Sequence, residues 1–107
     1  MAEIVKLSES TFQSEVLDST LPVLVDFTAV WCGPCKMLDP IVKQLAQEWE
    51  GRVKVAKLDV DDNPQLTEDY VIMGVPTLML FKHGQPVERM SGYHPKDRLS
   101  KKFTPHF

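Results

Sequence analysis

The sequence predicts an α/β fold with a mixed β-sheet sandwiched by helices. Runs of β-branched and aromatic residues alternate with segments whose apolar residues recur at helical spacing, which favours parallel core strands joined by helices. Late in the chain two strand-like runs flank a short turn, which predicts an antiparallel C-terminal hairpin at one side of the sheet. With 107 residues, 43% of them hydrophobic, the chain suits one domain, residues 1–107, whose core needs no metal or disulfide staple.

The first predicted elements are a short strand, a helix and a buried strand. Residues 4–7 are apolar-rich, and Ser10 with Gln13 resembles a capping box that opens a helix. Residues 23–27 form a nearly continuous apolar run, typical of a strand covered on both faces. We therefore expect residues 23–27 near the centre of the sheet.

A long helix and a second central strand are predicted next. Pro34 suits the first position of a helix whose apolar residues recur until Gly51 supplies a stop. Pro40 lies inside this pattern and predicts a kink. Loose alternation over residues 53–60 predicts the second central strand, and Asn63 is a good cap for a short helix over residues 66–70.

The end of the chain predicts a hairpin and a last helix. Residues 77–81 and 86–90 are the two hairpin strands, and Pro86, which has no backbone donor, places the second at the sheet edge. The final helix carries Leu99 and ends at Pro105. The predicted order of elements is therefore β-α-β-α-β-α-β-β-α.

Charge and hydropathy argue against two classes of partner. Fifteen acidic and twelve basic residues give a formal charge of -3, unlike the basic surface of a nucleic-acid-binding protein. No apolar run approaches the ~18 residues of a membrane span, and the first residues lack the basic and apolar regions of a leader peptide. We expect a cytoplasmic protein that binds neither nucleic acid nor membranes.

The two cysteines, Cys32 and Cys35, are separated by two residues, directly after a predicted buried strand and at the start of a predicted helix. A cysteine at a helix N-terminus faces free backbone N–H groups and the positive end of the helix dipole, which favour the thiolate. Cys35 follows nearly one turn later, in reach of Cys32 but deeper. A redox-active pair is the favoured interpretation. The alternatives are a stable disulfide, inert buried thiols or a zinc site, for which the chain has no second cysteine pair.

The sequence around these cysteines resembles the thioredoxin family. The resemblance spans almost the whole chain and rests on Val25-Asp26-Phe27, Ala29, Trp31 to Lys36, Pro40, Lys57, Gly74-Val75-Pro76-Thr77, Phe81, Gly84 and Gly92. It implies the thioredoxin fold and a protein-disulfide reductase. It also implies disulfide-containing protein substrates, no bound cofactor, and electrons from NADPH through a separate thioredoxin reductase. We expect no metal, because the chain has no second cysteine pair and its three histidines lack paired spacing, and we expect a monomer.

The resemblance also implies roles for individual residues. Cys32 attacks the substrate disulfide, Cys35 resolves the mixed disulfide, Asp26 exchanges a proton with Cys35, and Lys57 moderates the raised pKa of Asp26. The alternatives are a surface acid at Asp26 and a solvated lysine at Lys57.

A second group of residues is implied to form the substrate-binding surface. The resemblance implies a cis Val75–Pro76 bond facing the cysteines and a Val75 backbone that pairs with extended substrate; the alternative is a trans proline that starts a strand. The active-site loop and the surface around it are expected to comprise Trp31, Gly33, Pro34, Gly74, Val75, Pro76 and Gly92. Met73 and Tyr93 are candidates for which ordinary packing is an equal alternative.

Several residues depart from the family pattern. Thr28 stands where a large aromatic residue is common, Val30 replaces a polar residue, and the acidic Asp39 replaces an apolar or small one. Residues 103–107 shorten the usual last helix. Gly33-Pro34 between the cysteines is similar to the reducing members of the family. A protein-binding module with dispensable cysteines is the alternative function.

Overall fold

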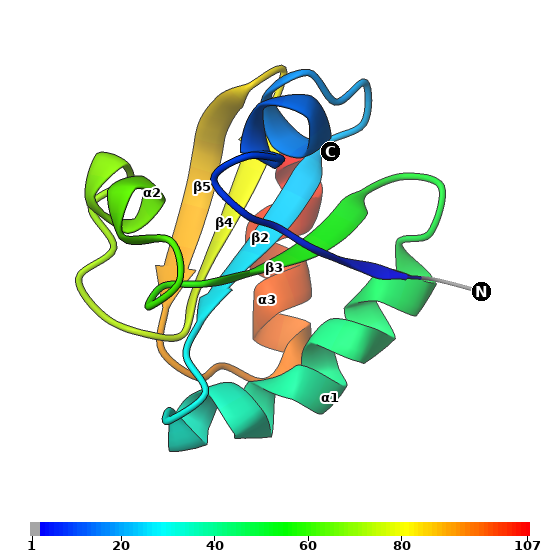
Figure 1. Cartoon of the computed structure of the whole chain (residues 1–107). Coiled ribbons are helices and arrows are strands. Elements are labelled where there is room, and N and C mark those ends of the chain that lie inside the picture. Colours follow the sequence, from blue (N-terminus) through cyan, green and yellow to red (C-terminus); the bar gives the residue numbers. More distant parts are fainter. Residues whose placement is uncertain (1–2) are drawn as a thin grey trace.

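The two strands predicted to be central, residues 23–27 and 53–60, lie in the interior of the sheet. The computed structural model of the chain describes residues 3–107. The sheet has five strands in the spatial order β1 (Ile4–Lys6), β3 (Lys54–Asp59), β2 (Val23–Thr28), β4 (Thr77–Lys82) and β5 (Gln85–Ser91). β1, β3 and β2 are parallel to one another, whereas β4 is antiparallel to both of its neighbours, β2 and β5 (Figure 1). The predicted mixed sheet with a hairpin at one side is confirmed.

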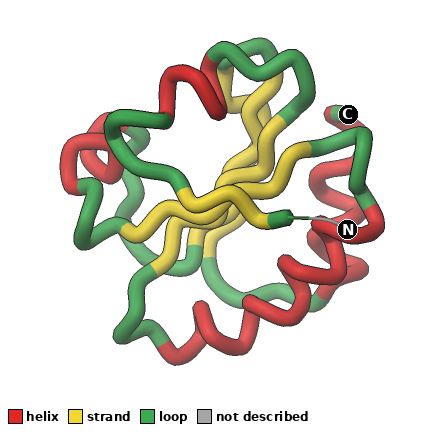
Figure 2. The backbone as a smooth tube through the Cα atoms, turned by 45° about the vertical axis from the view of Figure 1, so that its right-hand side comes forward, coloured by secondary structure: helices red, strands yellow, loops and turns green. Residues whose placement is uncertain are grey.

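Helices cover both faces of this sheet (Figure 2). In chain order the helical elements are η1 (Gln13–Leu17, a π-helix), α1 (Gly33–Glu48), α2 (Pro64–Asp69), α3 (Lys96–Phe103) and η2 (Thr104–His106, a 3₁₀ turn). Apolar residues of α1 and α3 form one core with one face of the sheet, and those of η1 and α2 form a second core with the other face. The predicted order of elements is confirmed, with η2 as an addition.

The alternation of side chains along β2 and β3 determines the face of the sheet on which their polar residues lie. Leu24 packs in the core shared with α1 and α3, whereas Val25 and Phe27 pack in the opposite core. Because side chains alternate along a strand, Asp26 points to the same face as Leu24. Lys57 shares its face with Val55 by the same rule, and Asp26 is its register partner. Asp26 and Lys57 therefore lie side by side under α1, the helix that begins beside Cys32.

The capping box predicted at Ser10 does not form. The helical element begins at Gln13, with no side-chain hydrogen bond at its N-cap. Ser10 Oγ instead lies 2.9 Å from Ser8 Oγ. The prediction was wrong because a serine side chain can bond to other nearby groups as readily as to a helix N-terminus.

The cap of α2 also differs from the prediction. Asn63 is the N-cap residue, but its side chain makes no cap hydrogen bond; its Oδ1 accepts from the Glu9 N–H at 2.9 Å. Glu9 Oε2 in turn accepts from the N–H groups of Gln65 at 2.8 Å and Leu66 at 3.3 Å. A residue distant in sequence therefore caps α2.

The remaining turns follow the prolines and glycines of the sequence. α1 continues through Pro40 and ends at Glu48. His83 and Gly84 both have positive φ, 53° and 76°, as a two-residue turn between twisted strands requires. Pro86 lies on β5, which is an edge strand as predicted. The last α-helix ends at Phe103, two residues before Pro105.

Candidate active site

The cysteine pair lies at the start of α1, with Cys32 at the end of the turn that follows β2 and Cys35 in the first turn of the helix. Cys32 is the N-cap residue of α1, with an extended backbone, and its Sγ accepts a hydrogen bond from the Cys35 N–H at 3.1 Å. The two cysteines form a disulfide across a Cα–Cα distance of 5.3 Å. Gly33 and Pro34 lie in the exposed first turn, where the missing N–H of proline costs no helical hydrogen bond. This sulfur position at a helix start favours a negative charge on Cys32.

The cysteines do not differ in exposure, contrary to the expectation that Cys35 lies deeper. Each residue is 3% exposed in the disulfide form. They differ in what surrounds them. Cys32 Sγ lies 3.7 Å from the carbonyl oxygen of Val75, whereas Cys35 lines a cavity of about 260 Å³ between α1 and the ends of β2 and β3.

The segment before β4 lies against Cys32. The Val75–Pro76 peptide bond is cis, as the family resemblance implied, and Val75 packs against the cysteine cluster. Thr77 Oγ1 donates to the Gly74 carbonyl at 2.7 Å, and the Gly92 N–H donates to the Pro76 carbonyl at 2.8 Å. The structure thus brings Gly74, Val75, Pro76 and Gly92 together beside the disulfide.

Exposed apolar side chains occur close in sequence to the cysteine pair and to residues 74–76 and Gly92 beside it. They are Val30, Trp31, Met37, Met73 and Tyr93, of which Met73 is 90% exposed. This exposure argues against the packing alternative for Met73 and Tyr93. Trp31 and Met73 line one side of a cavity of about 180 Å³ together with Val75. The Trp31 indole Nε1 donates to Asp61 Oδ2 at 2.7 Å, a contact that sequence reasoning missed.

Asp26 is buried under the active-site helix. Its residue is 1% exposed, and its Oδ1 has no hydrogen-bond partner among the described residues. Burial raises the pKa of this carboxyl from 3.8 to about 7, while Lys57 lowers it and Asp39 raises it. The surface-acid alternative is therefore wrong, and a carboxyl that exchanges its proton near neutral pH lies on the face of the sheet that α1 covers.

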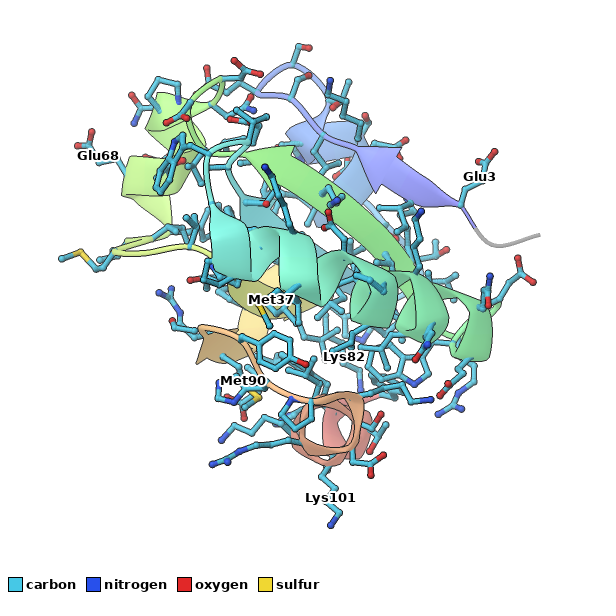
Figure 3. The ribbon with its side chains drawn as sticks, turned by 90° about the horizontal axis from the view of Figure 1, so that it is seen from below. Glu3, Met37, Glu68, Lys82, Met90 and Lys101 are labelled. Carbon is cyan, nitrogen blue, oxygen red and sulfur yellow. A yellow bond between two sulfur atoms is a disulfide. The ribbon has the colours of Figure 1, made fainter. Side chains whose placement is uncertain are left out.

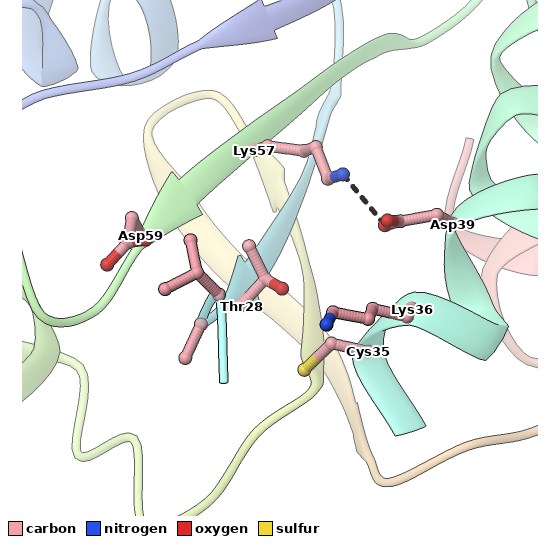
Figure 4. A pocket seen from close by; sticks show the side chains of 8 residues that line it. Thr28, Cys35, Lys36, Asp39, Lys57 and Asp59 are labelled. Carbon is pink, nitrogen blue, oxygen red and sulfur yellow. Dashed lines mark hydrogen bonds and ion pairs between the residues drawn. The ribbon is translucent and has the colours of Figure 1, made fainter. Parts of the chain in front are cut away.

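Lys57 pairs with a different carboxylate. Its Nζ donates to Asp39 Oδ1 at 2.7 Å across the cavity that Cys35 lines (Figure 4). The solvated-lysine alternative does not hold, because both side chains are only about one-third exposed, 32% and 38%. Sequence reasoning singled out Asp39 as a departure from the family pattern but gave no signal that its partner is Lys57.

Thr28 leaves space beside this ion pair. It is half-buried at the end of β2 and lines two neighbouring cavities, of about 260 and 360 Å³. A side chain larger than threonine has room there.

The described residues contain no cluster of three His, Cys, Asp or Glu side chains able to hold a metal ion. Within residues 3–107, no helix is both long and apolar enough to cross a membrane.

A disulfide-forming cysteine pair at a helix start, beside an exposed apolar surface on a mixed α/β sheet, defines a thiol–disulfide oxidoreductase. Residues 3–104 match the family model described as Thioredoxin. The chain is 49% identical over 106 residues to Thioredoxin 1 of Nostoc sp. (strain PCC 7120), covering 99% of each chain. It is 45% identical over 103 residues to a thioredoxin of Staphylococcus aureus (strain Mu50), covering 96% of this chain and 97% of the relative.

The chain belongs to the thioredoxin family. It is a protein-disulfide oxidoreductase of a family that carries no prosthetic cofactor and acts on disulfide-containing proteins. This membership, together with the cysteine pair, favours the redox function over that of a protein-binding module.

Proposed function

We propose that the chain reduces protein disulfides by a two-step exchange in which Cys32 attacks and Cys35 resolves. The observation that carries this order is the hydrogen bond from the Cys35 N–H to Cys32 Sγ at the first turn of α1. In the reduced protein the same N–H and the helix dipole stabilise a thiolate at Cys32. The resolving thiol receives no such support from the helix start.

The exchange balances in atoms and electrons. The Cys32 thiolate attacks one sulfur of the substrate disulfide, which forms a mixed disulfide and releases the other sulfur as a thiolate. The Cys35 thiol loses its proton and attacks Cys32 Sγ, which forms the Cys32–Cys35 disulfide and releases the second substrate thiolate. The substrate gains two electrons and, from solvent and the Cys35 thiol, two protons; the chain ends oxidised.

Asp26 is the proposed proton acceptor for Cys35. Its carboxyl lies on the sheet face under α1, and burial holds its pKa at about 7, close to the pH at which a general base works best in neutral solution. Lys57 is proposed to stabilise the ionised form of Asp26, its register partner across β2 and β3.

The apolar surface around Cys32 is the proposed substrate site. An extended substrate segment pairs with the backbone at the half-buried Val75, so that its disulfide meets Cys32 Sγ, 3.7 Å from the Val75 carbonyl oxygen. The exposed first turn of α1 supplies the adjoining edge of the site. The site is proposed to comprise Trp31, Gly33, Pro34, Gly74, Val75, Pro76 and Gly92. Pairing between backbones depends on the extended shape of the substrate segment more than on its side chains, which suits a broad range of protein substrates.

The disulfide must be reduced again after each cycle. The proposed electron source is NADPH, acting through a separate thioredoxin reductase, because the family carries no cofactor of its own. We propose that the chain works as a cytoplasmic monomer of one domain, residues 1–107, that binds neither nucleic acid nor membranes. A formal charge of -3 supports the proposal that the chain binds no nucleic acid.

Variants of the two cysteines test the order of attack. The assay follows a disulfide-bonded protein substrate with NADPH and a thioredoxin reductase, and trapped adducts are resolved by non-reducing electrophoresis. Cys32→Ser abolishes reduction without forming adducts, whereas Cys35→Ser attacks once and accumulates mixed disulfides. Equal trapping by both variants overturns the assignment, and binding retained by the double serine variant with no turnover in the native protein favours the binding module.

A further inference from the structure

The cavity beside Cys35 contains an ion pair between Lys57 and Asp39 that takes no direct part in the two exchange steps. Its lining comes from the end of β2, from β3 and from the first turns of α1, and it includes Cys35, Lys57 and Asp39 (Figure 4). The Lys57 ammonium crosses from the sheet to the helix and bonds Asp39 Oδ1 at 2.7 Å. The cation is therefore held on the helix side of the cavity.

Lys57 has a second carboxylate beside it. Asp26 is its register partner on β2, and both side chains point to the face covered by α1. The hydrogen bond nevertheless goes to Asp39, and Asp26 Oδ1 has no partner among the described residues. A buried carboxylate without a cation is costly, so this arrangement favours the protonated form of Asp26.

We propose that Asp39 is a positioning residue of the exchange reaction, which holds Lys57 against α1 and thereby keeps the buried Asp26 a stronger proton acceptor for Cys35. The proposal rests on the proposed role of Asp26. Asp39 touches no reacting atom in this scheme; it acts through Lys57.

The charges around Asp26 give the direction of the effect. Lys57 and Asp59 face the cavity from β3, and Lys36, Asp39 and the disulfide-bonded Cys35 face it from α1. Of these, Lys57 lowers the pKa of Asp26 and Asp39 raises it, against the larger rise that burial causes. Removing the Asp39 charge ends its direct repulsion of the Asp26 carboxylate. It also frees the Lys57 ammonium to turn toward Asp26. Both effects lower the pKa of Asp26.

Titration of the Asp26 carboxyl in the oxidised protein tests this without any activity. Carbon-13 NMR follows the side-chain carboxyl in the native chain, in Asp39→Asn and in Asp39→Ala. Both variants lower the Asp26 midpoint by about 1 pH unit, as expected when an opposite charge comes into reach. Glu68→Gln, which loses the same charge from the outward-pointing side chain on α2 (Figure 3), leaves the midpoint unchanged.

A double-mutant cycle separates positioning from direct repulsion. Lys57→Met removes the cation, and in that background Asp39→Asn shifts the Asp26 midpoint by less than half of its effect in the native chain. An unchanged midpoint in both Asp39 variants overturns the inference. An equal shift with and without Lys57 also overturns it, because Asp39 then acts through its own charge alone.

The pH profile of mixed-disulfide resolution distinguishes this inference from the proposed function. In Asp39→Asn the rise of the resolution rate moves to lower pH with the Asp26 midpoint, and the plateau falls because a weaker base accepts the proton. If Asp26→Asn keeps the native profile, the acceptor role fails whatever Asp39 does. If Asp26→Asn loses the profile but Asp39→Asn keeps both the midpoint and the profile of the native chain, only the positioning role fails.

Discussion

Cys32 and Cys35 are equally buried, so their chemistry differs through the groups that face each sulfur. Cys32 Sγ receives the Cys35 N–H at the start of α1, and it lies near the surface formed by Trp31 and Val75. Cys35 lies on the inner side, against the cavity that holds the Lys57 pair. The helix start thus stabilises one thiolate, while the other thiol depends on a proton acceptor.

This difference predicts the order of alkylation in the reduced protein. At neutral pH, limiting iodoacetamide modifies Cys32 about tenfold or more faster than Cys35, because the thiolate is the reactive form and the helix start favours it at Cys32. Peptide mapping after short reaction times measures the ratio. Alkylation under denaturing conditions is the control, in which the two rates converge. Faster modification of Cys35 in the folded protein contradicts the prediction.

The residues of the site differ in how far the sequence predicts them. The cysteine pair and its helix are visible because they are contiguous, and the burial of Asp26 follows from its apolar neighbours in β2. The Lys57–Asp39 pair joins a strand to a helix, and the Trp31–Asp61 bond joins two loops. No spacing rule links residues that meet only through tertiary packing, so these contacts required the structure.

At the scale of elements, hydrogen bonds of Glu9 link α2 to the segment between β1 and η1. Its carboxylate accepts two N–H groups of the first turn of α2, and its own N–H donates to Asn63 Oδ1. Glu9→Ala lowers the free energy of unfolding by about 1 kcal/mol, the usual cost of losing a helix cap, whereas Glu9→Gln loses less because its amide oxygen still accepts.

Urea titrations measure the two Glu9 variants beside Glu3→Ala, which removes the same charge from an exposed outward side chain (Figure 3). A loss as large in Glu3→Ala as in Glu9→Ala contradicts the capping role.

The end of β2 leaves room that a larger side chain can fill. Thr28→Trp places an indole into the adjoining cavities of about 260 and 360 Å³ and raises the free energy of unfolding by about 1 kcal/mol. For a domain of this size the melting temperature rises by roughly 4–8 °C. Calorimetry compares it with Thr28→Val, which removes the hydroxyl without filling the space. A lowered melting temperature in Thr28→Trp shows that the ring overpacks the site.

At the scale of the whole molecule, hydrophobic periodicity predicts the fold well. The continuous apolar runs of β2 and β4 correspond to strands buried on both faces, and Pro86 correctly indicates an edge. Two predictions of helix caps failed, the capping box at Ser10 and the Asn63 side-chain cap, because a polar side chain can bond to any of several nearby groups. Which of these groups it bonds to is decided by long-range packing, which local patterns do not contain.

Asp26 opposes the stability of the core that surrounds it. Its carboxyl has an unfolded pKa of 3.8 and a folded pKa raised to about 7 by burial, with Lys57 lowering and Asp39 raising it. Between these two values the folded protein holds a proton that the unfolded chain has released. The free energy of unfolding therefore falls as pH rises from about 4 to about 7, and then levels off.

Asp26→Asn removes this pH dependence together with the proton acceptor. Below pH ~4 the two proteins unfold with similar free energies, or the variant is slightly less stable because a buried amide adds N–H donors without partners. Toward pH 7 the variant becomes more stable than the native protein, and the difference approaches the order of 4 kcal/mol at alkaline pH. At the same time its turnover falls, because an amide cannot accept the Cys35 proton. Urea titrations of the oxidised proteins from pH 3.5 to 9, paired with turnover assays, measure both changes, and Glu68→Gln serves as the charge control. A stability difference that does not vary with pH contradicts the burial of an ionisable Asp26, and unchanged turnover contradicts its role as proton acceptor. Either result means that the carboxyl beneath α1 does not both destabilise the core and serve the reaction.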